Sequence, residues 1–330
     1  MPDIRGKNIL VIGGAGFIGS HVVDQLLLED VKNVIIYDNF VRGTADNVEK
    51  ALSDPRCKVF EAGGDILQKD ILNAAMKESN MVIHLAALWL LQCYEYPAAA
   101  FETNIRGTYN VLEACRDNKI ERLVYSSSAS VYGDAVEIPM TEEHPFNNRT
   151  FYGATKIAGE AMARAFYARY GVKYIGLRYM NVYGSRQDYK GTYIAVIMRI
   201  LDNLDAGKPP VVFGDGSQSY DFIYAEDAAR ANVFGLKSDT VDQFYNVGMG
   251  IKTSIKELTE ITLKIYGSGL NIEYKPEGTT FVTNRIGSTK KAEKELGFKA
   301  GIHLEEGLIK LIEWRKAHKE RFGERWKMFE

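Results

Sequence analysis

The fold of this chain can be predicted from one short segment near its start, which reads Asn8-Ile9-Leu10-Val11-Ile12-Gly13-Gly14-Ala15-Gly16-Phe17-Ile18-Gly19. The apolar run Asn8–Ile12 predicts a buried strand, and the apolar spacing of Ile18–Leu28 predicts a helix. Between them, Gly13 allows a tight turn, Gly16 lets the backbone approach a pyrophosphate, and Gly19 lets the helix pack closely on the strand. The N-terminus of such a helix offers unpaired N–H groups to phosphate. The sequence therefore predicts a dinucleotide-binding loop.

An acidic residue follows the second predicted strand. Val34–Tyr37 has the composition of a buried strand, and Asp38 and Asn39 come directly after it, with Asp38 nineteen residues beyond Gly19. A carboxylate at this place accepts the ribose hydroxyls of the cofactor and repels a 2′-phosphate. The sequence therefore predicts NAD as the cofactor, and Asp38 opposes the alternative of an NADP-dependent reductase.

Strands and helices go on alternating up to about residue 180, which predicts right-handed βαβ units and a parallel sheet. The further strands expected are Lys58–Glu61, Met81–His84, Arg122–Ser126 and Lys173–Tyr179, and the further helices are Phe101–Asp117 and Phe151–Tyr170. Beyond that point the chain is richer in turns, with helices expected at Ser254–Tyr266, Lys290–Leu296 and Leu304–Arg321. We expect an α/β fold in which a Rossmann-type doubly wound parallel sheet carries a smaller mixed α/β cap domain. Residues 1–180, together with about 220–247, would form the NAD-binding domain, and residues 181–219 and 248–330 the domain that binds the substrate.

Composition excludes several classes of function. The 41 basic and 43 acidic residues leave a net charge of −2, so the chain lacks the excess of basic residues that would predict binding to nucleic acid or anionic membranes. It has no run of about 18 apolar residues that would predict a membrane span. The three cysteines form no CxxC pair, which favours a reducing cytoplasm over a disulfide framework. The five histidines lack ligand spacing, and no metal site is expected.

A phenol and an ammonium group lie four residues apart in the predicted helix Phe151–Tyr170. Tyr152 and Lys156 therefore share one face of that helix. Nearby cations favour a phenolate, so we expect Lys156 and a cationic nicotinamide to lower the pKa of Tyr152 and make it a usable base. Ser128 follows a predicted strand and could bond the same substrate oxygen. A Ser–His–Asp hydrolase is the competing interpretation, but no GxSxG motif is present, and His84 is better explained as a structural histidine.

These motifs, taken in chain order, resemble a known family. They are GGAGFIG at 13–19, YDN at 37–39, HLAA at 84–87, SSSASVYG at 126–133, YGATK at 152–156 and LRYMNVYG at 177–184. The chain resembles the extended short-chain dehydrogenases/reductases that act on nucleotide sugars, and it is most similar to the UDP-sugar 4-epimerases. The resemblance runs over nearly the whole length.

The resemblance implies a role for each matching residue. Ser128, Tyr152 and Lys156 would be catalytic. The cofactor would be bound by Gly13, Gly16, Phe17, Ile18, Gly19, Asp38, Asn39, Asp65, Ile66, Leu85, Ala86, Ala87, Asn104, Tyr152 and Lys156. The substrate would be bound by Ser128, Tyr152, Asn181, Phe213, Tyr220, Arg285 and Trp89. The family also pairs the helices Phe101–Asp117 and Phe151–Tyr170 across a two-fold axis, which implies a homodimer.

The implied reaction is NAD-dependent epimerisation at C4 of a nucleotide sugar, through a transient 4-keto sugar. Dehydration, C4 dehydrogenation and a non-catalytic NAD sensor remain alternatives.

Three departures from the family pattern matter: Tyr220 replaces a common arginine, Ala129 and Ser130 replace the acidic pair of 4,6-dehydratases, and Trp89-Leu90-Leu91 makes a bulky apolar loop. That loop, with Asn284 aligned at the place where the family admits N-acetyl groups, predicts a preference for an N-acetylated or otherwise modified UDP-sugar.

Overall fold

The computed structural model describes residues 3–187, 195–276 and 282–319, and its main feature is a seven-stranded parallel sheet. The strand order is β11 (Gln243–Val247), β6 (Tyr174–Tyr179), β5 (Arg122–Ser128), β4 (Met81–His84), β1 (Asn8–Ile12), β2 (Asn33–Tyr37) and β3 (Cys57–Val59). The order reverses between β1 and β4, which pair side by side although two strands separate them in the chain. Ligands of such sheets bind beyond the carboxyl ends of the strands at this reversal.

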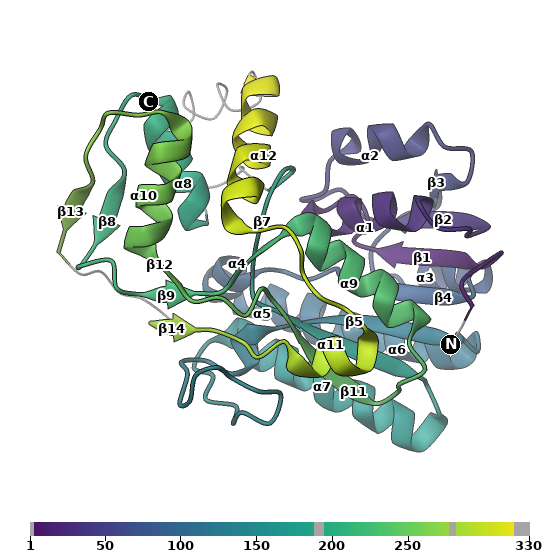
Figure 1. The fold of residues 1–330 in the computed structure, drawn as a ribbon. Helices are drawn as coiled ribbons and strands as arrows, with labels where there is room; N and C mark the ends of the chain where they lie inside the picture. Colours follow the sequence, from purple (N-terminus) through teal and green to yellow (C-terminus); the bar gives the residue numbers. More distant parts are fainter. Residues whose placement is uncertain (1–2, 188–194, 277–281, 320–330) are drawn as a thin grey trace.

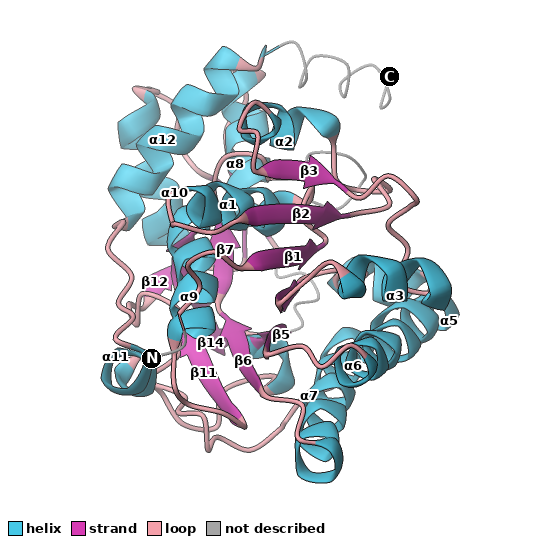
Figure 2. Ribbon diagram, turned by 90° about the vertical axis from the view of Figure 1, so that its right-hand side faces the viewer, coloured by secondary structure: helices cyan, strands magenta, loops and turns pink. Residues whose placement is uncertain are grey.

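Helices cover both faces of the sheet (Figure 2). One layer contains α1 (Phe17–Leu27), α2 (Ala45–Leu52) and α9 (Ala225–Lys237), and the other contains α3 (Lys69–Lys77), α6 (Gly107–Asp117) and α7 (Phe151–Tyr170). Alternation along β1 builds the two cores, because Ile9 and Val11 pack in one cluster while Leu10 and Ile12 pack in the other. The predicted Rossmann-type sheet is confirmed.

A second lobe, at the left of Figure 1, has a hydrophobic core of its own. Its helices are α8 (Val196–Asp205), α10 (Ile255–Tyr266) and α12 (Leu304–Ala317), while α11 (Lys290–Leu296) packs near β11. Its short strands pair as β7 (Asn181–Tyr183) with β10 (Phe222–Tyr224), β8 (Val211–Phe213) with β13 (Glu273–Lys275), and β9 (Ser219–Tyr220) with β12 (Thr253–Ser254) and β14 (Asn284–Arg285).

Several elements differ from the predictions. The predicted strand Lys58–Glu61 is observed at Cys57–Val59, and the predicted helix Phe101–Asp117 begins with a π-helical turn, η1 (Phe101–Arg106), before α6. Two short helices, α4 (Leu90–Glu95) and α5 (Pro97–Ala100), and the 3₁₀ turn η2 (Ala129–Val131) complete the set. The last predicted helix ends at Ala317, and residues from 320 onward lie outside the described part of the chain.

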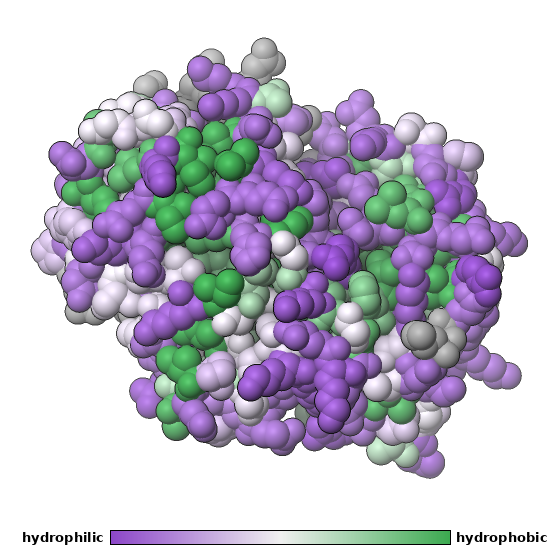
Figure 3. Space-filling view, in the orientation of Figure 1, coloured by the Kyte–Doolittle hydropathy of each residue, from purple (hydrophilic) through white to green (hydrophobic). Residues whose placement is uncertain are grey.

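The face drawn in Figure 3 is mostly hydrophilic, with hydrophobic side chains in small groups. Within the described residues, no helix combines the length and the hydropathy needed to cross a membrane.

Candidate active site

A cavity of about 610 Å³ opens at the carboxyl ends of β1, β2 and β4. The glycine loop forms its floor, and a Cβ at Gly13 would lie 2.8 Å from the backbone nitrogen of Ala86. Helix α1 begins after Gly16 with no side chain capping its first turn, so the N–H groups there remain available to an anion. A narrow glycine cradle facing an uncapped helix N-terminus fits the pyrophosphate of a dinucleotide.

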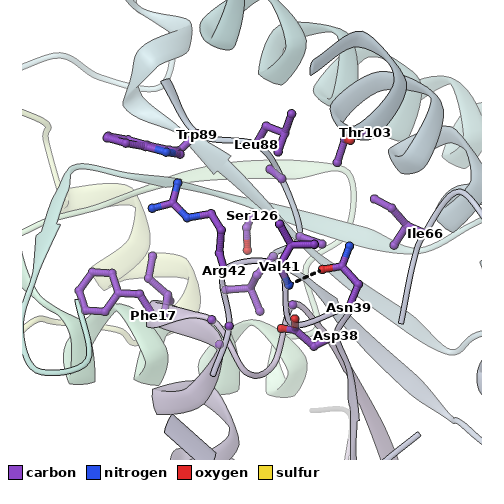
Figure 4. Close-up of a pocket in the computed structure, with 18 of the residues that line it drawn as sticks. Phe17, Asp38, Asn39, Val41, Arg42, Ile66, Leu88, Trp89, Thr103 and Ser126 are labelled. Atoms are coloured by element: carbon purple, nitrogen blue, oxygen red, sulfur yellow. Dashed lines mark hydrogen bonds between the residues drawn. The ribbon is translucent and has the colours of Figure 1, made fainter. Parts of the chain in front are cut away.

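Asp38 lines the same cavity at the end of β2 (Figure 4). Its carboxylate accepts hydrogen bonds from the backbone N–H groups of Ala15 at 2.9 Å and Phe40 at 2.8 Å. Burial raises the pKa of this carboxyl group, and the two backbone bonds oppose the rise. Arg42 extends away from Asp38 toward Trp89, so its guanidinium does not offer a counter-ion for a 2′-phosphate beside Asp38. The residues therefore fit NAD.

The cavity brings together nearly all the residues predicted to bind the cofactor. Its lining includes Gly13, Gly16, Phe17, Ile18, Gly19, Asp38, Asn39, Asp65, Ile66, Leu85, Ala86, Ala87, Tyr152 and Lys156. Asn104 lies outside this lining, and its neighbour Thr103 reaches the cavity instead. The Asn104 amide accepts a hydrogen bond from Leu88 N at 2.7 Å and donates to Leu88 O at 2.9 Å and to Thr155 Oγ1 at 3.1 Å. Asn104 therefore positions the loop after β4 against α7.

Tyr152 and Lys156 both lie on the inner face of α7. The Lys156 ammonium donates a hydrogen bond to Ser126 O at 2.7 Å and lies 5.7 Å from the centre of the Tyr152 ring. Burial lowers the pKa of Lys156 to about 8. Burial also raises the pKa of Tyr152 to about 12, against a lowering by its hydrogen bond with Ser128. Burial therefore has the largest effect on the Tyr152 pKa in the protein alone, and the lowering expected from Lys156 together with a cationic nicotinamide stays a prediction.

A second cavity, of about 1010 Å³, meets the first one at Tyr152. The residues predicted to bind substrate all line it: Trp89, Ser128, Tyr152, Asn181, Phe213, Tyr220 and Arg285. The two cavities share Phe17, Ile18, Trp89, Ser127, Tyr152, Tyr179, Gln187 and Ala195. Two ligands, one in each cavity, would therefore meet at the phenol of Tyr152.

Arg285, a half-buried residue, lines the second cavity. Its buried Nε atom has no hydrogen-bond partner within the described part of the chain, and burial lowers the pKa of its guanidinium. A buried donor left unpaired in a cavity suits an anionic ligand. Tyr220, which stands in place of the family's common arginine, donates its hydroxyl to Val282 O at 2.7 Å. The Tyr220 hydroxyl is thus bonded to backbone, whereas the Arg285 side chain lines the cavity.

Several lining residues were not predicted. Gln187 lines both cavities, and its buried Oε1 atom has no hydrogen-bond partner among residues 3–187, 195–276 and 282–319. Arg42 and Trp314 line the cofactor cavity, and Trp314 comes from α12, far away in the sequence. Asn284, by contrast, was expected at the place where the family admits N-acetyl groups, but it lies outside the lining of both cavities, and its backbone N–H donates to Asp134 Oδ1 at 3.1 Å. The unpredicted residues lie on loops or a distant helix, where spacing carries no signal.

His84 agrees with its interpretation as a structural histidine. It is buried outside both cavities, and its Nε2 atom lies 3.1 Å from Thr108 Oγ1.

Comparisons with known proteins place this geometry in context. Residues 9–248 match the model of the NAD dependent epimerase/dehydratase family. A relative from Methanocaldococcus jannaschii, named only provisionally as a UDP-glucose 4-epimerase, is 38% identical over 313 residues, which cover 93% of this chain and 98% of the relative.

Solved structures give the same picture. A UDP-N-acetylglucosamine 4-epimerase from Methanobrevibacter ruminantium M1, in complex with UDP-N-acetylmuramic acid, superposes with a TM-score of 0.89 at 32% identity, covering 95% of this chain and 99% of that one. A dTDP-glucose 4,6-dehydratase from Streptomyces venezuelae, with NAD bound, superposes with a TM-score of 0.86 at 26% identity, covering 95% and 98% of the two chains.

Proposed function

Because the chain belongs to the NAD-dependent epimerase/dehydratase family, we propose that it inverts C4 of a UDP-activated sugar. Membership of this family confirms the predicted enzyme type and the predicted NAD cofactor. The observation that carries the proposal is the meeting of the two cavities at Tyr152, with Ser128 and Lys156 beside it. A sugar in the second cavity would present its C4 hydroxyl to the Tyr152 phenol, on the side that faces the cofactor.

The chain's own residues then handle protons and orientation. Tyr152 takes the proton of the C4 hydroxyl while Ser128 holds the same oxygen by a hydrogen bond. Tyr152 returns the proton after the keto sugar has rotated to present its other face. When bound, NAD supplies a reversible hydride acceptor for C4 and a positive charge that favours the Tyr152 phenolate. Arg285 holds the diphosphate, so the sugar can rotate about a fixed anchor.

Dehydration at C5 and C6 needs an acid close to Ser128. In this chain the next two positions hold Ala129 and Ser130, both buried and neither acidic. Without an acid at these two positions to expel the C6 hydroxyl, we expect the 4-keto sugar to be reduced again rather than dehydrated. This difference favours epimerisation over the dehydratase activity found elsewhere in the family.

Nuclear magnetic resonance of the products tests the proposal. The protein is incubated with UDP-glucose and with UDP-N-acetylglucosamine while absorbance at the NADH band is followed. We expect a mixture of C4 epimers without net NADH. Accumulation of a 4-keto-6-deoxy sugar, or of NADH in step with an oxidised sugar, would show a different reaction.

The loop after β4 favours one class of sugar in the second cavity. Trp89 and Leu90 line the second cavity and offer it bulk with few hydrogen-bonding groups. An apolar wall leaves a sugar hydroxyl unpaired, at a cost of about 1–3 kcal/mol, but accepts a methyl group. We therefore assign an N-acetylated UDP-sugar as the preferred substrate. Steady-state kinetics check this assignment, since a higher kcat/KM for UDP-glucose than for UDP-N-acetylglucosamine would contradict it.

We also propose a homodimer in the cytoplasm. Large apolar side chains remain exposed on η1, α6 and α7: Phe101, Tyr109, Phe151 and Tyr170. A two-fold axis beside these helices would bury them against their copies. The cysteines Cys57, Cys93 and Cys115 are free and buried, which suits a reducing compartment.

A further inference from the structure

Two loops on opposite sides of the cofactor cavity meet above it. Arg42, in the loop between β2 and α2, places its guanidinium carbon 4.9 Å from the centre of the Trp89 ring, which belongs to the loop after β4. The Arg42 Nη1 atom also donates a hydrogen bond to Gln92 Oε1 at 3.1 Å. Arg42 and Trp89 both line the cofactor cavity, and Figure 4 shows Arg42 reaching across it toward Trp89.

The loop that carries Arg42 is fixed by its own sequence. Asp38 and Asn39 form successive turns by accepting hydrogen bonds from Phe40 N at 2.8 Å and Val41 N at 3.2 Å. Gly43 packs so closely that a Cβ there would lie 2.8 Å from the carbonyl carbon of Ala15 in the glycine loop. Arg42 therefore starts from a defined point at the edge of the cavity.

The loop that carries Trp89 is fixed from the other side. Asn104 binds both the N–H and the carbonyl of Leu88, the residue before Trp89. Helix α4 begins at once, with Cys93 N donating to Trp89 O at 2.9 Å, and Gln92 lies in its first turn. Two rigid supports therefore hold a cation, an aromatic ring and an amide in contact across the cavity.

We propose that Arg42, Trp89 and Gln92 form a strap that closes over the cofactor and slows its release. A dinucleotide beneath them can leave only after the contact between Arg42 and Trp89 has opened. The inference rests on the proposed function for its purpose, since an epimerase must keep the reduced cofactor until the same sugar has been reduced again. Retention of the cofactor can nevertheless be measured without any sugar.

The test is the rate at which bound NAD exchanges. Protein loaded with isotopically labelled NAD is mixed with excess unlabelled NAD, and the label that stays with the protein is followed by rapid gel filtration. Arg42→Ala should release NAD about tenfold faster, and Gln92→Ala about fivefold faster, because each variant loses a partly desolvated contact of the strap. Arg42→Met, which keeps the length of the side chain, serves if the alanine variant does not fold.

The matched control is Lys316→Ala, which removes a cation from the ring of Tyr266, at 5.9 Å, in the other lobe. It should release NAD at the wild-type rate. Wild-type release from Arg42→Ala and Arg42→Met would overturn the strap. Faster release from Arg42→Ala with unchanged release from Gln92→Ala would also overturn it, because Arg42 would then act directly on the cofactor phosphates. No UDP-sugar is present, so the result does not depend on the proposed reaction.

Discussion

At the scale of single residues, the site contains ionisable side chains whose burial disfavours their charged forms. Lys156 is buried, its pKa is lowered to about 8, and its hydrogen bond to Ser126 O holds it beside the cofactor cavity. Tyr152, one turn earlier, has its pKa raised to about 12 by the same burial. Because burial disfavours the charged form of both groups, the positive charge of a bound cofactor would favour the Tyr152 phenolate.

Tyr152→Phe removes the proposed base and keeps the aromatic ring beside Lys156. We expect turnover to fall by about 10²–10⁴-fold, the usual contribution of a positioned acid–base group, with NAD still bound. Product formation is measured by NMR, and the melting temperature is the control for folding. A variant that keeps more than half of the activity would remove Tyr152 from the mechanism.

Lys156→Met should stabilise the cofactor-free protein at neutral pH. The ordinary pKa of 10.5 falls to about 8 in the fold, so the buried charge costs on the order of 3 kcal/mol, partly offset by the bond to Ser126. Because the folded pKa is the lower one, this cost is full below about pH 8 and disappears as the pH rises through 10.5. Denaturation curves should therefore show a gain of about 1–2 kcal/mol at pH 7 that shrinks by pH 10. A variant less stable than the wild type at pH 7 would refute the buried charge.

At the scale of elements, the sequence predicted the strands and helices with strong periodicity. The helix Phe151–Tyr170 and the strand Asn8–Ile12 are observed at their predicted bounds, because apolar spacing and glycine turns determine both. The π-helical turn Phe101–Arg106 was not predicted, since its extra residue per turn leaves no mark in a 3.6-residue pattern. Gln187 and Arg42 were also missed, because a loop residue reaches a cavity through backbone geometry rather than spacing.

The π-helical turn has a measurable role. It places Asn104 where its amide satisfies both polar groups of Leu88 and the hydroxyl of Thr155. Asn104→Ala would remove all three bonds, although Thr155 Oγ1 still donates to Tyr152 O at 2.8 Å and Leu88 O still accepts from Cys93 Sγ at 3.3 Å. Because the Leu88 N–H loses the Asn104 acceptor, we expect a loss of about 1–3 kcal/mol in the free energy of unfolding. Chemical denaturation measures the loss. Asn118→Ala, which removes a partly buried asparagine bonded to Asn73 at 3.0 Å, is the control for an ordinary amide, and an equal loss in both variants would argue against a special role for Asn104.

At the scale of the whole molecule, two cavities with different chemistry share one phenol. The cavity at the sheet reversal has an uncapped helix N-terminus and the Asp38 carboxylate, while the second cavity is lined by the half-buried Arg285 and by the apolar side chains of Trp89 and Leu90. The first cavity could be predicted from the sequence, because the carboxyl ends of parallel strands lie at the same edge of the sheet. The second depends on packing between distant segments, and spacing along the chain could not predict its shape.

The proposed dimer is tested by Tyr170→Asp. Tyr170 lies at the end of α7 with 50% of its surface exposed, and a charge there should weaken an apolar contact between copies. Light scattering should give twice the chain mass of 37.0 kDa for the wild type and a lower mass for the variant. Tyr274→Asp, equally exposed on β13, is the matched control and should remain dimeric. A wild-type mass of one chain at micromolar concentration would rule out the dimer.

The fate of the hydrogen at sugar C4 shows whether the protein inverts C4 through a 4-keto sugar with one retained cofactor. The protein is given UDP-N-acetylglucosamine carrying deuterium at C4, and both C4 epimers are isolated at equilibrium. Oxidation and reduction at one site, with one retained cofactor, predict that the deuterium stays at C4 in both epimers in the presence of excess unlabelled NAD. Loss of the deuterium from the C4 epimer, or a product inverted at a carbon other than C4, would contradict a reaction through a 4-keto sugar and one retained cofactor.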